Sequence, residues 1–457
     1  AAGCTKAAHL DVHNLYGLSE TAVTHEALQS LLPTVRPLII SRSTFPGAGR
    51  FAGHWLGDNC ATWEDLRASL PGVLTMGLFG LSLVGADICG FAGATTRELC
   101  IRWTQVGALA YPFARNHNDN VSPAQEPSAW DAEATAMMRA AIATRYRLLP
   151  YLYSAFHDAH ATGIPVARSL LLEFQEEALH AVGGGREMLD AIAAVDEQVM
   201  MGGALLVTPV LAEGARNVTG YFPPGRWFAL ASGEELRPVP WGSSAPGAER
   251  GSVPGRVQLE APLDTVPVHV RGGYVVPMQR AALTSQAARA TPFTFLAAPN
   301  GAGGAAGRAV LDDGETSDRD APRTILRLAL HSSLGGESGN FTLSPEGSYS
   351  PNSDPRIMQD MTVEEVRVLG VWGLSGRSLQ GMANGEPLSP EAFLFDEESK
   401  ALSIRLWKQP LGVPRWREAP EDREKRRAEA LRRGEPRLPS ATAPLEISWS
   451  AEAEAAS

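Results

Sequence analysis

Cysteine is scarce in this chain, with four residues among 457. So few cysteines in a chain of this length exclude a disulfide-built scaffold, and no pair has the CxxC spacing of a zinc site or redox centre. A basic surface is also lacking, because the net charge is −11. The composition therefore gives no support to nucleic-acid or anionic-lipid binding.

Long apolar runs are missing as well. The longest uncharged apolar run, Gly72–Ala86, contains several glycines and is shorter than the ~20 residues that a membrane-spanning helix needs. We therefore predict no membrane span and assign this run to a buried strand with its loop. Hydrophobic residues make up 44% of the chain, which is enough for several domains with cores of their own.

Helix and strand signals alternate through residues 1–165, which is typical of a parallel α/β architecture. Serine and threonine residues mark the predicted helix starts, two of them with an acid three residues later as in a capping box. These starts are Ser19, Thr62 with Asp65, Thr95 with Glu98, and Ser128, whose helix runs to about His160 with a kink at Pro150. The predicted strands are Leu38–Ser41, Leu81–Ala86 and Gly107–Phe113. We count about four strand–helix units, half of what an eight-stranded barrel needs.

Beyond Val166 the helical periodicity fades, and short β-branched and aromatic runs predict antiparallel sheet. Residues 284–307 are rich in Ala, Gly and Ser and are interpreted as a linker or loop. The charge-dense stretch 415–437 mixes acidic with basic residues, which favours a solvated loop or exposed helix over a nucleic-acid contact. The predicted strands are Ala204–Val210, Val218–Phe222, Val266–Val270, Gly273–Pro277, Arg323–Leu330, Thr362–Leu369, Ala401–Trp407 and Leu445–Trp449.

Two carboxylates are the first candidates for chemistry. Asp58 and Asp87 lie at the ends of apolar stretches with aromatic and glycine neighbours. Glycoside hydrolysis needs one carboxylic acid to protonate the leaving oxygen and a second carboxylate across the sugar plane. Trp55 and Phe91 are suited to form apolar walls around such an acid and to stack on a pyranose ring. From spacing alone, Asp58 also fits a helix cap or surface turn, and Asp87 a buried hydrogen-bonding residue.

Two basic side chains accompany these acids. Arg42 follows a buried strand, where a cation needs a carboxylate partner, either an active-site acid or an ordinary core ion pair. His117 lies in a polar run at a strand end. Without a paired histidine or an HExxH motif, it is more typical of a hydrogen-bonding group than of a metal ligand. The sequence contains no GxSxG motif, phosphate-binding loop or dinucleotide fingerprint after a strand, and no cofactor is predicted.

Short motifs along nearly the whole chain occur in a combination that is highly specific. They are Asp11–Leu18, Ser41–Phe45, Gly53–Asn59, Val84–Phe91, Arg102–Gln105, Arg115–Asn118, Thr144–Tyr151, Thr208–Leu211, Asn217–Pro223, Val270–Tyr274 and Asp312–Glu315. This set resembles glycoside hydrolase family 31. The resemblance implies the C-terminal half of a catalytic (β/α)8 barrel at residues 1–166 and a proximal β-sandwich domain at 167–282. It also implies a distal β-sandwich domain at 283–457, with a charged insertion near 415–437.

The resemblance also implies roles for the candidate residues. Asp58 corresponds by motif position to the general acid/base. The residues that correspond to the sugar-binding subsite are Arg42, Trp55, Asp87, Phe91 and His117. Cys89 and Cys100 correspond to a disulfide-bonded pair, and no metal ligand is implied.

One expected catalytic residue has no counterpart. The family's nucleophile lies in a WxDMNEP-type motif upstream of the segment that matches Asp11–Leu18, and no such motif occurs in these 457 residues. We therefore expect the chain to be a fragment that lacks the nucleophile and the first half of the barrel, and to be inactive alone.

The implied activity is that of a retaining exo-α-glucosidase acting on terminal non-reducing α-linked glucose of maltose-type oligosaccharides, such as starch or glycogen fragments. No cofactor, nucleic acid or membrane span is implied. The alternatives are a non-catalytic truncated remnant or sugar-binding fragment, and another activity of the family such as α-xylosidase. The resemblance and the glycosylation sequons at Asn120, Asn217 and Asn340 fit the secretory pathway, with a lysosomal, vacuolar or extracellular destination.

Overall fold

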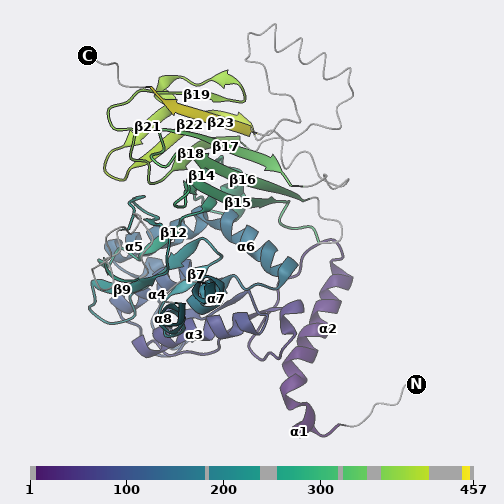
Figure 1. Ribbon diagram of the computed structural model, residues 1–457. Helices are drawn as coiled ribbons and strands as arrows, with labels where there is room; N and C mark the ends of the chain where they lie inside the picture. The colour runs from purple at the N-terminus through teal and green to yellow at the C-terminus, as the bar shows by residue number, and fades with distance from the viewer. Residues whose placement is uncertain are drawn as a thin grey trace, which may run out of the picture. The chain divides into compact units, whose positions relative to one another are not determined.

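The computed structural model describes residues 7–180, 185–236, 255–317, 323–346, 362–410 and 445–452. The chain divides into two compact units (Figure 1). The first comprises Ala1–Ala231, Leu236–Arg271 and Glu315–Asp320, and the second comprises Ser232–Glu235, Gly272–Gly314 and Ala321–Ser457. The predicted charged insertion near 415–437 lies outside the described residues, and the division into three domains stays a prediction.

Parallel strands and their connecting helices form the first part of the first unit. The pairs β1–β2, β2–β3 and β4–β5 are all parallel, and one residue, Ala86, separates β3 from β4. Helices α3 and α4 connect successive strands, as in a (β/α)8 barrel. The strands are β1 (Ile40–Ser41), β2 (Gly53–Trp55), β3 (Val84–Gly85), β4 (Asp87–Ile88) and β5 (Arg115–Asn116). The helices up to this point are α1 (His9–Val12), α2 (Tyr16–Leu31), α3 (Trp63–Leu78) and α4 (Arg97–Leu109).

One predicted helix start is confirmed and the others are wrong in position. The Thr62 side chain accepts the N–H of Asp65 and begins α3, as predicted. Helix α4 begins after Thr96 rather than Thr95, because the Thr96 hydroxyl is the one that accepts the Leu99 N–H. Ser19 lies inside α2, where its hydroxyl donates to the carbonyl of the preceding turn instead of capping a helix.

The strand predicted at Gly107–Phe113 is wrong. Helix α4 continues to Leu109, and every residue from Leu99 to Leu109 is buried. A helix covered on all sides has an apolar sequence without amphipathic periodicity, which is easily confused with a buried strand. The strand itself is β5, which follows at Arg115–Asn116.

The long helix predicted from Ser128 is two helices. Helix α5 (Ala132–Arg147) is capped by Asp131, whose carboxylate accepts the Ala134 N–H, and α6 (Leu149–Thr162) follows after Leu148. Pro150 lies in the first turn of α6, where its missing N–H removes no helical hydrogen bond. The break therefore falls just before the proline.

A buried arginine fixes α4 within the first unit. The Arg102 guanidinium donates to the carbonyls of Ala215, Ala261, Pro262 and Thr265, and burial lowers its pKa to about 10. The Arg102–Gln105 motif thus has a structural role: it joins a barrel helix to the loop that follows β11 (Gly255–Glu260).

Antiparallel sheet and two helices complete the first unit. The five-stranded sheet has the order β10-β12-β8-β7-β6, and β9 pairs with β11 in a separate ribbon. Helices α7 (Leu170–His180) and α8 (Gly185–Ala193) pack on these strands around Phe174, Phe222 and Trp227, although the sequence predicted no helix there. The strands are β6 (Ala167–Arg168), β7 (Val199–Met201), β8 (Leu205–Val207), β9 (Asn217–Phe222), β10 (Trp227–Ala229) and β12 (Val268–Arg271).

The described strands of the second unit form one eleven-stranded sheet with the order β20-β19-β23-β17-β16-β15-β13-β14-β18-β22-β21, drawn green to yellow in Figure 1. Residues from distant strands, such as Ala383 and Leu402, share one apolar core, which requires the sheet to curl around it. The strands are β13 (Tyr274–Gln279), β14 (Phe293–Ala298), β15 (Gly304–Leu311), β16 (Thr324–Ser332), β17 (Ser338–Pro345), β18 (Thr362–Val368), β19 (Leu379–Ala383), β20 (Glu386–Pro387), β21 (Phe393–Asp396), β22 (Ala401–Pro410) and β23 (Leu445–Ala451).

The linker predicted at residues 284–307 is wrong. This segment contains the short helix α9 (Ser285–Arg289), all of β14 and the start of β15. Its small residues serve close packing, since a Cβ atom on Gly307 would lie 2.1 Å from the carbonyl oxygen of Val275. By contrast, each strand predicted after Val166 overlaps an observed strand.

Within the described part of the chain, no helix is both long and apolar enough to cross a membrane.

Candidate active site

The predicted site residues gather at the carboxyl ends of the parallel strands, the edge where (β/α)8 barrels carry their chemistry. Arg42 directly follows β1, and Trp55 ends β2 with Asp58 three residues later. Asp87 comes two residues after β3, at the start of the short strand β4, and His117 directly follows β5. The strand order therefore brings together residues that are up to 75 positions apart in sequence.

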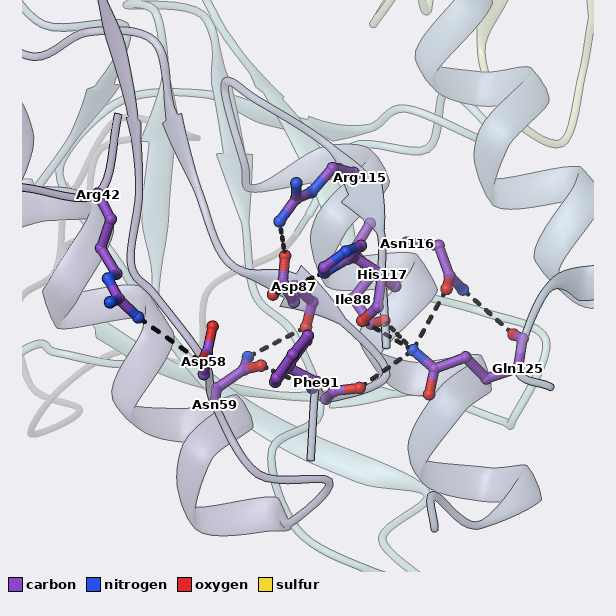
Figure 2. A network of polar contacts seen from close by, with 11 residues as sticks. Arg42, Asp58, Asn59, Asp87, Ile88, Phe91, Arg115, Asn116, His117 and Gln125 are labelled. Carbon is purple, nitrogen blue, oxygen red and sulfur yellow. Dashed lines mark hydrogen bonds and ion pairs between the residues drawn. The ribbon is translucent and has the colours of Figure 1, made fainter. Parts of the chain in front are cut away.

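Asp58 and Arg42 form an ion pair, with 3.6 Å between the carboxylate and guanidinium (Figure 2). The side chains are 49% and 58% exposed, respectively. The expected apolar walls around Asp58 are therefore not closed in this structure, and the carboxylate can be reached by a solute.

Two guanidinium groups lie near the ring of Trp55. The Cζ atoms of Arg42 and Arg115 are 5.7 and 5.4 Å from the centre of its ring, which is within cation–π range. The indole therefore contacts both arginines of the site. Its neighbour His54 is buried in β2, and burial lowers the pKa of that imidazole.

Asp87 is the buried charge of the site, with its side chain 1% exposed. It forms an ion pair with Arg115, and one carboxylate oxygen lies 3.4 Å from Nδ1 of His117. Sequence reasoning singled out Asp87 and His117 but missed Arg115, which stands in the same Arg-Asn-His-Asn motif. The signal was available, because a buried carboxylate at a strand end needs a cationic partner.

Phe91 and His117 stack on each other, with ring centres 5.2 Å apart and an angle of 20° between planes. Phe91 can reach this position because the chain turns sharply at Cys89 and Gly90, which have φ values of 74° and 90°. A Cβ atom on Gly90 would lie 2.5 Å from the backbone nitrogen of Ala61, so only glycine fits between this turn and the Asp58 loop.

The disulfide between Cys89 and Cys100 is present, as the family resemblance implied. It ties the segment after β4 to the first turn of α4. Both cysteines are fully buried, whereas Cys60 is a free, exposed thiol.

Two amide side chains that sequence reasoning missed join the loops of the site. Asn59 bonds to the main chain of Asp87 and Phe91, and Gln125 bonds to the segments that follow β4 and β5. Nothing in the sequence marked Gln125, because a glutamine in a loop is ordinarily exposed.

The geometry separates the two aspartates chemically. Asp87 is buried and engaged by Arg115 and His117, so it is suited to hold a ligand hydroxyl rather than to exchange protons with solvent. Asp58 is accessible and pairs with Arg42 alone among the described residues, which suits proton transfer. The described residues contain no cluster of three or more His, Cys, Asp or Glu side chains able to hold a metal ion.

Comparisons with known proteins identify the family of the chain. Residues 3–155 match the "Glycosyl hydrolases family 31 TIM-barrel domain" and residues 163–276 match the "Glycosyl hydrolase family 31 C-terminal domain". The chain belongs to glycoside hydrolase family 31, and its parallel strands are part of that family's TIM barrel.

Among curated relatives, the lysosomal α-glucosidase of Mus musculus is 42% identical over 406 residues, which cover 87% of this chain and 39% of the mouse protein. The intestinal sucrase-isomaltase of Oryctolagus cuniculus is 42% identical over 396 residues, covering 86% of this chain and 20% of that protein. The chain thus spans about two fifths of the length of the mouse enzyme.

Solved structures share the fold. The glucosidase II alpha subunit bound to α3-Glc2 superposes with a TM-score of 0.74 at 22% identity, covering 97% of this chain and 43% of that one. A Flavobacterium johnsoniae family 31 dextranase complexed with glucose gives a TM-score of 0.73 at 22% identity, covering 97% and 49%.

Proposed function

We propose that this chain carries the acid/base half of the active site of a retaining exo-α-glucosidase, which releases terminal glucose from maltose-type oligosaccharides. The observation that carries the proposal is an accessible Asp58–Arg42 pair beside a buried Asp87 that binds Arg115 and His117. The 42% identity to the mouse lysosomal α-glucosidase supports the substrate class.

In the proposed mechanism, Asp58 protonates the leaving glycosidic oxygen while a second carboxylate attacks the anomeric carbon. Asp58 then deprotonates water, which releases the sugar with its configuration retained. The second carboxylate is assigned to a polypeptide segment outside these 457 residues, because no WxDMNEP-type motif occurs in them and Asp87 is already engaged by Arg115 and His117. On this assignment the chain alone is inactive.

The other site residues orient the sugar. Asp87 accepts hydrogen bonds from ring hydroxyls, and His117 donates one to a ring hydroxyl. These bonds keep the anomeric carbon in line for attack. Arg42 contacts the sugar, while Trp55 and Phe91 line the subsite. No cofactor takes part.

The first test uses Asp58→Asn, with Asp196→Asn as the matched control. Asp196 also pairs with an arginine, Arg67, at 3.5 Å and is 60% exposed, but it lies on another surface element. Activity is measured in the 457-residue chain and in the same chain joined to the N-terminal portion of the mouse enzyme that it does not cover. We expect the chain alone to be inactive.

In the joined protein, Asp58→Asn is expected to lower kcat/KM for maltose about 10³-fold, and Asp196→Asn to leave it unchanged. Azide should restore turnover of an activated aryl α-glucoside, giving α-glucosyl azide, because azide needs no general base. Full activity of Asp58→Asn would refute the acid/base role. Maltose hydrolysis by the chain alone would refute the external nucleophile.

A second candidate is sugar binding without hydrolysis. It is favoured by the open position of Asp58, which is half-exposed and held by Arg42 rather than enclosed. Glucose binding by the joined protein without turnover of any α-glucoside would select this candidate. Turnover of α-xylosides in preference to α-glucosides would instead assign a different activity of the same family.

We also propose a secretory-pathway compartment, lysosomal, vacuolar or extracellular. The lysosomal relative, the buried disulfide and the exposed sequon residue Asn217 support it. Asn217→Gln should remove one glycan from the secreted protein, seen as a mass loss that glycosidase treatment of the parent reproduces.

A further inference from the structure

The segment Asp87–Phe91 is held at both ends by the amide of Asn59. Its Nδ2 donates to the carbonyl of Asp87 over 3.0 Å, and its Oδ1 accepts the N–H of Phe91 over 2.9 Å (Figure 2). Asn59 directly follows Asp58. These two hydrogen bonds therefore fix the position of the segment that carries Asp87 relative to the loop that carries Asp58.

Gln125 holds the same segment from its other side. Its Nε2 lies 3.1 Å from the carbonyl oxygen of Ile88, 3.0 Å from that of Gly90 and 3.1 Å from that of His117. It also lies 3.3 Å from Oδ1 of Asn116. Ile88 ends β4 and Gly90 follows it, while Asn116 ends β5 and His117 follows it, so one NH2 group joins two loops of the site at the ends of their strands.

The orientation of the Gln125 amide is fixed by its surroundings. The opposite orientation would place Oε1 against four oxygen atoms, none of which carries a hydrogen to donate. The main-chain carbonyl of Gln125 accepts from Asn116 Nδ2 at 3.1 Å and from Trp130 Nε1 at 3.3 Å. The side chain is therefore anchored at its base as well as at its tip.

The oxygen and the nitrogen of the Gln125 amide differ in their hydrogen bonding. Gln125 is 1% exposed, and its Oε1 makes no hydrogen bond among the described residues, although a buried, unpaired acceptor is unfavourable. An apolar side chain of the same volume would remove that acceptor. It would also leave the main-chain carbonyls of Ile88, Gly90 and His117 without this donor and the two loops unconnected.

We propose that Gln125 is a positioning residue: it fixes the relative positions of Asp87 and His117 by joining the loops after β4 and β5. Asn59 fixes the position of the first of these loops relative to Asp58. The inference rests on the proposed function for its link to sugar binding. The placement of the two loops can be tested without the proposed function, because Phe91 and His117 lie on these loops and their ring contact depends on that placement.

The test is Gln125→Met, which keeps the volume and removes the donors, read by NMR in the 457-residue chain. Ring-to-ring NOEs between Phe91 and His117, and the ring-current shift of the His117 protons, are expected to be lost. The matched control is Gln105→Met. Gln105 is 2% exposed and its Nε2 donates to Leu263 at 2.8 Å, away from the site. Both variants should lower Tm, but only Gln125→Met should change the ring signals.

Wild-type NOEs and ring-current shifts in Gln125→Met would overturn the proposal. If that variant does not fold, Gln125→Glu replaces it, since a protonated carboxyl retains one donor and a carboxylate has none. The ring contact should then be present in acid and lost once the carboxylate ionises. A contact that persists in both forms would also overturn the proposal.

Activity separates this inference from the proposed function. In the joined protein, Gln125→Met should lower kcat/KM about 10- to 100-fold, because misplacement of a binding group by about 1 Å has that effect, and Gln105→Met less than about 2-fold. If Asp58→Asn stays active, the proposed function fails while the ring signals still decide the role of Gln125. If the ring signals survive in Gln125→Met, only the positioning role fails.

Discussion

At the scale of single residues, burial distinguishes two aspartates that the sequence presents alike. Asp58 and Asp87 both end apolar stretches, yet their side chains are 49% and 1% exposed. A half-exposed ion pair is screened by water and adds little stability, whereas a buried carboxylate depends on its partners. The same residue type therefore serves two purposes, accessible proton exchange at one position and fixed hydrogen bonding at the other.

We predict that Asp87→Asn lowers the free energy of unfolding by about 2 kcal/mol, because it leaves the Arg115 guanidinium without its charge partner. Asp58→Asn should change it by less than about 0.5 kcal/mol. Urea denaturation of both variants, followed by tryptophan fluorescence, measures the difference. Equal values for the two variants would contradict the contrast in burial.

At the scale of elements, a disulfide and a buried histidine fix short segments. The segment after β4 has two consecutive residues with positive φ, Cys89 and Gly90, so local propensity does not hold it. The disulfide to Cys100 and the amides of Asn59 and Gln125 supply that constraint.

We predict that replacing Cys89 and Cys100 together by alanine lowers the free energy of unfolding of the first unit. The bridge closes a loop with a sequence separation of 11, and releasing a loop of that size corresponds to about 3 kcal/mol. Cys60→Ala, which removes the exposed free thiol, should have no effect. Calorimetry distinguishes the two variants, and an unchanged melting temperature in the double variant would contradict the prediction.

Strand β12 carries His269, which is packed against Phe222 with ring centres 4.9 Å apart, and burial lowers its pKa to about 4. In the unfolded chain the imidazole takes up a proton near pH 6.5, so unfolding binds a proton between pH 6.5 and 4. The contribution of His269 to the free energy of unfolding is fully present above pH 6.5, and it falls by about 3 kcal/mol as the pH drops to 4.

We therefore predict that His269→Leu flattens the decline of stability between pH 6.5 and 4, measured by urea denaturation at a series of pH values. A smaller decline of the free energy of unfolding with falling pH should remain, since burial also lowers the pKa of His54. A variant with the wild-type slope would show that His269 is not the group responsible.

At the scale of the whole molecule, the chain has two compact units with separate apolar cores. Phe174 belongs to the core of the first unit and Phe295 to that of the second, and each is at most 1% exposed. Side chains this well buried contribute to the stability of the unit that contains them.

We predict that Phe174→Ala and Phe295→Ala each lower the stability of one unit by about 3–5 kcal/mol. Calorimetry should show two transitions, with a different one displaced in each variant. A single transition displaced equally by both substitutions would show that the two units unfold together.

The sequence by itself determined the family, the barrel-to-sheet change near Val166, and the candidates Asp58, Asp87 and His117. These follow from local information, since strand ends, capping residues and motif spacing are written in consecutive residues. Local pattern failed where burial was complete. Helix α4 is covered on all sides, so its end has the apolar pattern of a strand, and the small residues in β14 and β15 have the composition of a linker.

The tertiary structure alone decided which of these candidates meet. The ion pair of Asp87 with Arg115 spans 28 residues, and the contacts of Gln125 reach 37 residues back to Ile88. No local preference encodes such pairs. They arise because parallel strands bring their carboxyl ends to one edge and a buried amide or charge must find partners there.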